Sequence, residues 1–340
     1  MKILLHMGPG KTGTTALQQS LHDGADVLRT RSVLYPRFGG SAIAHHLLLA
    51  LCEHPDRLTG WTLQEHGGPE ATADRAWQVW NELCLAVAAR PPRVLVLSSE
   101  VLFQQARGKA KALLAETLSE LTTDITPILY IRDPVSQYRA RLQEWLKTEN
   151  APLPPSRLPL REAILDTGAA FGRPPELVAF DRATLKGGDI TTDFVTRFLG
   201  PEVTPDDLPR HQANVGLSAE TLVLLARLRR DGGLTAAARR RGERLIRPLA
   251  ALDRSDPPDA PLTLHPEVAE AALRAATCHR WLAETGRLVL PGLDTGRIDG
   301  APPPGWMQAA PPETLFPHDP ARLARLTAAL WQSHPHLMAG

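Results

Sequence analysis

Short apolar runs alternate with amphipathic stretches along the first two thirds of the chain. The runs at residues 2–6, 93–97 and 125–131 are mainly apolar and are bounded by polar, glycine or proline residues. Such runs are typical of strands that are buried on both faces of a sheet. Weaker runs predict further strands at 33–35 and 176–180.

Helical periodicity fills the segments between these strands. Helices are predicted at residues 14–21, 44–51, 71–89 and 109–121, from Pro134 onward, and from Asp189 to Leu199. Asp133 can cap the helix that Pro134 opens. The alternation of buried strands and helices predicts an α/β fold, with a parallel sheet between two helical layers in a three-layer α/β/α core.

The pattern changes after residue 217. Helices are predicted at 218–230, 235–252, 266–284 and 320–333, and no further strand is predicted. We therefore expect an α/β core over residues 1–217 and a mainly helical C-terminal region over residues 218–340. We expect the helical region to pack on the core rather than to fold independently.

The charge and cysteine content of the 340 residues excludes several classes of protein. Basic residues number 38 and acidic residues 37, a balance that argues against a protein that coats nucleic acid. The three cysteines are scattered and form no CxxC pair, which argues against a disulfide framework and a cysteine zinc site. No apolar run is long enough to span a membrane, and no secretory signal is visible. We expect a cytoplasmic protein.

The most informative segment follows the first predicted strand. It reads His6-Met7-Gly8-Pro9-Gly10-Lys11-Thr12-Gly13-Thr14-Thr15. Glycines let the backbone turn so that several N–H groups point inward, and the next helix adds partial positive charge at its N-terminus. Lys11 is one of only six lysines in the chain and adds a full charge. The pattern predicts an anion-binding loop.

The loop departs from the ATP-binding motif G-x-x-x-x-G-K-[ST]. Gly10-Lys11-Thr12 fits the end of that motif, but its first glycine would fall at Leu5, and Gly8 gives a shorter loop. The spacing favours a nucleotide with a different arrangement of phosphates.

The string Lys11-Thr12-Gly13-Thr14-Thr15, with Leu17-Gln18 after it, resembles the 5′-phosphosulfate loop of bacterial sulfotransferases. These enzymes use 3′-phosphoadenosine-5′-phosphosulfate (PAPS) and have a P-loop-like α/β fold. The resemblance implies transfer of a sulfuryl group to a hydroxyl on a carbohydrate, lipid or small metabolite, with no metal required. It also implies that Lys11 contacts the bridging and sulfuryl oxygens, while Gly10, Thr12, Gly13, Thr14 and Thr15 complete the loop around the 5′-phosphate.

A second motif, Arg132-Asp133-Pro134, resembles the 3′-phosphate motif of the same family. Arg132 offers a planar fork that suits phosphate. The family usually has a serine eight residues later, where this chain has Ala140. Ser136, Arg139 or Arg141 are the candidates to replace that serine.

Residues 210–218 resemble a polar segment that precedes a helix in many bacterial members of the family. By this resemblance Asn214 is a further candidate for binding the nucleotide. The alternative is that the segment only caps a helix through Ser218.

Transfer to a hydroxyl needs a base that takes its proton. Glu100 is the first candidate because it follows a strand at the edge of the sheet where ligands of α/β proteins bind. His46 and His45 are rivals on the helix predicted at 44–51, after the second strand, and neighbouring positions on a helix point about 100° apart. His6, at the end of the first strand, is either a residue that lies under the loop or a structural histidine, and the second interpretation is favoured.

Several features leave alternatives open. Eight arginines between Arg227 and Arg247 predict either a solvated basic helix face or an edge that binds an acidic acceptor, and too few aromatic residues accompany them for nucleic acid. Trp61, Trp77, Trp80 and Trp145 are either core or the lining of a sugar site. Two functional alternatives remain, a kinase or NTPase that uses ATP and Mg²⁺ and a non-catalytic nucleotide-binding protein. The acceptor and the oligomeric state have no sequence signature.

Overall fold

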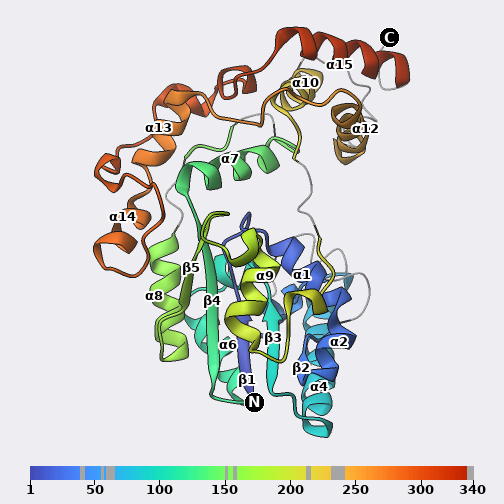
Figure 1. Ribbon diagram of the computed structural model, residues 1–340, viewed down its shortest axis with the longest axis vertical. Coiled ribbons are helices and arrows are strands. Elements are labelled where there is room, and N and C mark those ends of the chain that lie inside the picture. The colour runs from blue at the N-terminus through green and yellow to red at the C-terminus, as the bar shows by residue number, and fades with distance from the viewer. Residues whose placement is uncertain are drawn as a thin grey trace. The chain divides into compact units, whose positions relative to one another are not determined.

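A computed structural model describes residues 1–38, 43–54, 57–58, 66–149, 152–155, 159–211, 216–230 and 242–334 (Figure 1). The chain divides into two compact units. Unit 1 comprises Met1–Asp133, Pro159–Ala213 and Trp281–Leu293, and unit 2 comprises Pro134–Leu158, Asn214–Arg280 and Asp294–Gly340. The predicted division at residue 217 stays a prediction.

Unit 1 contains a five-stranded sheet in which all neighbouring strands are parallel. The strands are β1 (Lys2–His6), β2 (Val33–Leu34), β3 (Val94–Ser98), β4 (Ile125–Arg132) and β5 (Glu176–Phe180), in the order β2-β3-β1-β4-β5. The prediction of an α/β fold with a parallel sheet is confirmed. All five predicted strands are present. The side chains of β1, β3 and β4 are nearly all buried, whereas only Val178 is buried in the edge strand β5.

Helices cover both faces of this sheet. On one face lie α1 (Thr14–Asp23), α2 (Ala25–Thr30) and α9 (Ile190–Phe194), which continues as a π-helical turn over Val195–Leu199 (Figure 1). The other helices of this unit are α4 (Pro69–Ala89), α5 (Val101–Gln104), α6 (Lys109–Ser119) and α8 (Leu160–Phe171). Fully buried residues alternate along the strands: Leu4 and Val96 pack in the core under α1 and α9, so Ile3 and Leu97 face the opposite side.

Several segments of unit 1 differ from the sequence prediction. Residues 44–51 form a shorter 3₁₀ helix, η1 (His46–Leu51), instead of an α-helix. The start of η1 is fixed because the backbone N–H of His45 donates to Ser98 O at 2.9 Å. The backbone N–H of Leu48 then donates to His45 O, three residues earlier, which is the hydrogen bond of a 3₁₀ helix. The short helices α2 and α5 were not predicted, and neither was helix α8. It packs on α6, where the buried Lys111 donates to Ala163 O at 2.9 Å.

Unit 2 is helical, and none of its described residues forms a strand. Its helices are α7 (Pro134–Trp145), α10 (Ala219–Arg230), α12 (Gly242–Ser255), α13 (Pro266–Arg274), the first turn of α14 (Thr277–Glu284) and α15 (Pro320–Ser333). Leu142, Leu222, Phe316 and Leu326 belong to its core. The predicted helical C-terminal part is therefore present.

The prediction of one helix over residues 266–284 is wrong, because the helix breaks between α13 and α14. The carbonyl of Arg274 accepts a hydrogen bond from the backbone N–H of Gly300 at 2.8 Å. The Arg274 guanidinium is also paired with Asp299. This long-range cap ends α13, although no glycine or proline in the local sequence marks the break.

Candidate functional site

The loop between β1 and α1 is curled by two residues in the left-handed region. Lys11 has a φ of 70° and Gly13 a φ of 75°. Positive φ is uncommon for a residue with a side chain, and it marks a strained backbone of the kind that clusters at ligand sites. Alternation of left- and right-handed residues turns successive N–H groups to one side, which makes a concavity for anions at the N-terminus of α1.

The loop residues divide into an exposed and a buried set. The side chains of Lys11 and Thr15 are exposed, whereas those of Thr12 and Thr14 are buried. Thr12 Oγ1 donates to Pro9 O at 2.8 Å and lies 3.5 Å from Thr14 Oγ1. The buried threonines therefore hold the shape of the loop.

Gly13 is required by packing as well as by its φ. A methyl group at this position would lie 3.1 Å from both Ile190 Cγ2 and Phe180 Cε2. The absence of a side chain thus lets the loop approach α9 and the end of β5 closely.

Arg132 joins the second predicted motif to the first. It ends β4, its Nη1 donates to Lys11 O at 2.9 Å, and its guanidinium lies 5.6 Å from the centre of the Phe180 ring. Strands β1 and β4 are neighbours in the sheet. After β1 the chain continues to β2 at one edge of the sheet, and after β4 it continues to β5 at the other edge. Such a switch point is where parallel α/β sheets bind ligands, so the two motifs meet at the expected edge.

A chain of hydrogen bonds runs from the end of β1 toward Glu100. His6 Nδ1 lies 2.8 Å from Ser98 Oγ, at the end of β3. Gln18 Nε2, on α1, donates to Ser98 Oγ and to Glu100 Oε2, each at 3.2 Å. Burial lowers the pKa of His6 to about 4, so its ring is neutral near pH 7. The contact of Gln18 with the candidate base Glu100 was not identified from the sequence, and neither was the contact of Ser98 with Gln18 and His6.

His46 and Glu100, predicted as rival bases, lie side by side. His46 Nε2 is 3.9 Å from Glu100 Oε2, and His46 Nδ1 is 2.8 Å from Ser99 Oγ. The side chains of His46 and Glu100 remain 19% and 27% exposed. A carboxylate and an imidazole in this arrangement can take a proton from a hydroxyl group that approaches from solvent.

His45 occupies a different environment from His46. Its Nδ1 accepts a hydrogen bond from the backbone N–H of Ser98 at 2.9 Å, and its Nε2 lies 2.8 Å from Pro36 O. Burial lowers the pKa of His45 to about 4. Both ring nitrogens are bound to the backbone, so His45 supports the fold where β3 ends.

The remaining predicted nucleotide ligands are Ser136 and Asn214. Ser136 and Ala140 belong to α7 of unit 2, where Arg139 Nη1 donates to Leu262 O at 3.0 Å. Asn214 lies outside the described residues, as does Trp61. The proposed roles of Ser136 and Asn214 stay predictions.

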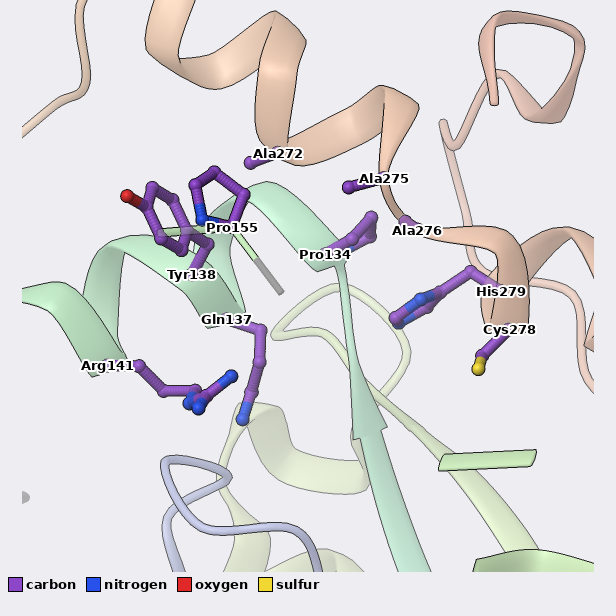
Figure 2. Close-up of a pocket in the computed structure, with 10 residues that line it drawn as sticks. All are labelled: Pro134, Gln137, Tyr138, Arg141, Pro155, Ala272, Ala275, Ala276, Cys278 and His279. Carbon is purple, nitrogen blue, oxygen red and sulfur yellow. The ribbon is translucent and has the colours of Figure 1, made fainter. Parts of the chain in front are cut away.

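Unit 2 has an open hollow lined by residues of α7, α13 and the start of α14 (Figure 2). Ala272, Ala275 and Ala276 line one side, and Gln137 and Arg141 extend from the same side of α7. Burial lowers the pKa of Arg141. The hollow thus combines an apolar wall with a cationic group.

The arginine-rich segment of unit 2 is partly described. Arg227 and Arg230 both pair with Glu313, and Arg229 donates to the carbonyl of Leu146 at 3.0 Å. These three arginines are therefore bound within unit 2. Residues 231–241 lie outside the described part, so the prediction of an acceptor edge stays open.

The tryptophans also differ in environment. Trp80 is fully buried in unit 1, whereas Trp77 and Trp145 are partly exposed. In the described ranges, no cluster of three or more His, Cys, Asp or Glu side chains is arranged to hold a metal ion.

Comparisons with models of known protein families, with curated proteins and with solved structures found no match. Within the part of the chain that the structure covers, no helix is long and apolar enough to cross a membrane.

Proposed function

We propose that this protein is a PAPS-dependent sulfotransferase that moves a sulfuryl group to a hydroxyl acceptor. The observation that carries the proposal is the hydrogen bond from Arg132 to the backbone of Lys11. It links the loop that resembles a 5′-phosphosulfate loop to the arginine that resembles a 3′-phosphate ligand. Two anion-binding elements at one edge of the sheet suit a nucleotide that carries phosphate groups at both positions.

The residues present fit the chemistry of this donor. The curled backbone and the N-terminus of α1 supply N–H groups for the 5′-phosphate, and the exposed Lys11 supplies a positive charge for the leaving group. Arg132 supplies a fork for the 3′-phosphate.

The transfer step balances without a further reactant. The acceptor oxygen forms a bond to sulfur while the bond from sulfur to the 5′-phosphate oxygen breaks. The hydroxyl proton passes to Glu100 or His46, and 3′-phosphoadenosine-5′-phosphate (PAP) leaves with the bonding electrons. As in phosphoryl transfer, positioning and electrostatic stabilisation carry most of the rate enhancement.

Thermal unfolding in the presence of PAP, PAPS and ATP·Mg²⁺ tests the proposal. A ligand at 100 times its dissociation constant adds about 2.7 kcal/mol of stability. We expect PAP and PAPS to stabilise the protein and ATP·Mg²⁺ to act weakly. Stabilisation by ATP·Mg²⁺ alone would point to a kinase or NTPase, and stabilisation by none of the three would contradict nucleotide binding.

The variant Lys11→Ala sharpens this test. It keeps a Cβ at the position of positive φ and removes only the charged end, so we expect PAP affinity to fall about ten- to hundredfold by calorimetry. Lys109→Ala is the matched control, because Lys109 is an exposed lysine at the start of α6. Equal affinities of both variants would show that the loop does not hold the ligand.

A further inference from the structure

Three polar side chains converge on Gly8 at the start of the loop. A methyl group added to Gly8 would lie 3.2 Å from His6 Nε2, 3.4 Å from Thr12 Oγ1 and 3.6 Å from Thr14 Oγ1. All three side chains are buried, and His6 is completely so. A side chain at position 8 would occupy the space beside these three polar atoms.

His6 Nε2 has no hydrogen-bond partner among the residues that the structure describes. A buried polar atom without a partner costs about 1–3 kcal/mol, so nearly all such atoms in folded proteins are paired. This atom lies below the anion-binding concavity at the N-terminus of α1. Its position is an independent sign that the loop holds a ligand.

The hydrogen bonds of Ser98 indicate which nitrogen of His6 carries the proton. Ser98 Oγ accepts a hydrogen bond from Gln18 Nε2, and its only other side-chain contact in the described ranges is His6 Nδ1. If the Ser98 hydroxyl donates to Nδ1, every group of Ser98 is satisfied and the proton of His6 is on Nε2. The opposite tautomer leaves both the Ser98 proton and Nε2 without partners.

Nε2–H is therefore a donor, and its partner has to be an acceptor. The hydroxyl of Thr12 already donates to Pro9 O, so Thr12 has no further proton to offer to an oxyanion. Thr14 adds a hydroxyl that can donate. We propose that His6 is a ligand-binding residue of the loop, whose Nε2–H donates to one oxygen of the phosphate or sulfuryl group that the loop holds.

This inference rests on the proposed function for the identity of the ligand, but it requires only an oxyanion in the loop. The two hypotheses can therefore fail separately. The sequence favours a structural role for His6, and the contact of Nδ1 with Ser98 Oγ suits that role. Nε2 is the part of the ring that the structural role leaves unused.

Two substitutions at His6 separate the two ring nitrogens. In His6→Asn the side-chain amide replaces Nδ1 and can still bind Ser98, whereas in His6→Gln the amide reaches toward the position of Nε2. We expect PAP affinity, measured by calorimetry, to fall about tenfold or more in His6→Asn and much less in His6→Gln. A purely structural role through Ser98 predicts the reverse order.

Gly8→Ala tests the same site through a substitution in the loop that leaves His6 itself unchanged. The φ of Gly8 is outside the left-handed region, so alanine causes no backbone strain there, but its methyl group takes the space beside Nε2. We expect at least a tenfold loss of PAP affinity with folding retained. Gly168→Ala on α8, where an added methyl group makes only ordinary contacts, is the control and is expected to bind PAP normally.

NMR of the wild-type protein labelled with [¹⁵N]histidine gives a test that needs no variant to fold. We expect the proton of His6 on Nε2, and a shift of that signal when PAP is added. A proton on Nδ1, or a His6 signal that PAP leaves unchanged, would overturn the inference.

The outcomes distinguish this inference from the proposed function. If ATP·Mg²⁺ binds instead of PAP and shows the same dependence on His6, the sulfotransferase proposal fails and the role of His6 stands. If PAP binds equally to the wild type, His6→Asn and Gly8→Ala, the role of His6 fails and the function stands. If neither PAP, ATP·Mg²⁺ nor inorganic pyrophosphate binds, both are overturned.

Discussion

Each unit of this protein contains a buried network of hydrogen-bonded polar side chains. The two networks differ in how many of their polar atoms have partners within the unit. In unit 2, Arg322 on α15 is 2% exposed. Its Nη1 donates to Ser218 Oγ at 2.8 Å and Glu220 Oε2 at 2.5 Å, its Nη2 donates to Asp253 Oδ1 at 2.7 Å, and its Nε donates to Asp256 O at 3.0 Å. All three nitrogens of the guanidinium are thus bound inside the unit.

The network in unit 1 is incomplete at both of its ends. His6 has one bound and one unbound ring nitrogen, and Glu100 and His46 at the other end are partly exposed. A network that is satisfied internally specifies a fold, whereas one that stops at a loop or at solvent leaves groups for a ligand. This difference is why we assign structure to Arg322 and function to the ends of strands β1 and β3.

The largest effect is expected for Arg322→Ala. The substitution leaves the buried carboxylates of Glu220 and Asp253 without their cation, so we expect the free energy of unfolding to fall by about 3–5 kcal/mol in urea titrations. Arg325→Ala is the control, because the ion pair of Arg325 with Asp256 is exposed. A small loss for Arg322→Ala would show that the network in unit 2 is not what holds its helices together.

For Glu100→Gln we expect a loss of activity and not of stability, the reverse of the expectation for Arg322→Ala. We expect sulfuryl transfer to slow by about a hundredfold or more, because removal of a general base costs that much, while urea stability changes little. Glu116→Gln, at an exposed position on α6, is the control and should transfer normally. The rate of sulfuryl transfer by His46→Ala, compared with that of Glu100→Gln, shows whether Glu100 or His46 takes the proton. Normal turnover in both variants would place the base elsewhere.

Mild acid should weaken unit 1. Burial lowers the pKa of His6 and His45 to about 4, whereas the unfolded side chains keep the ordinary value of 6.5. Between these values the unfolded state binds more protons, so stability is present above pH 6.5 and is lost as the pH falls toward 4. The loss at pH 5 is on the order of 2 kcal/mol for each histidine.

Hydrogen exchange at pH 7 and pH 5 measures this effect in the segments that contain β1 and β3. We expect protection there to fall with pH, and less so in His45→Gln, which lacks one of the two groups. Equal protection at both pH values would show that neither histidine is held neutral by the fold.

The sequence was sufficient to predict the parts of the fold that depend on local pattern. The five strands, the loop at Lys11 and the position of Arg132 at the end of β4 all follow from residues close together in the chain. The break between α13 and α14 was missed because it depends on Gly300, which is distant in sequence from the end of α13.

The candidate site was predictable as separate residues but not as an arrangement. His46 and Glu100 were predicted as rivals, and only the docking of His45 on the end of β3 makes them neighbours. Gln18 was noted as part of a motif, but its contact with Glu100 depends on how α1 packs against β3. Tertiary contacts of this kind have no local sequence signal.

The most direct test of the central claim is sulfuryl transfer itself. The protein is incubated with [³⁵S]PAPS and a mixture of carbohydrate, lipid and small-molecule hydroxyl compounds, and labelled products are separated by chromatography. The account predicts an acceptor labelled through a sulfate ester, equimolar release of PAP, and little labelling with Lys11→Ala or Glu100→Gln. Tight binding of PAP with no labelled acceptor, or phosphoryl transfer from [γ-³²P]ATP to the same mixture, would contradict it.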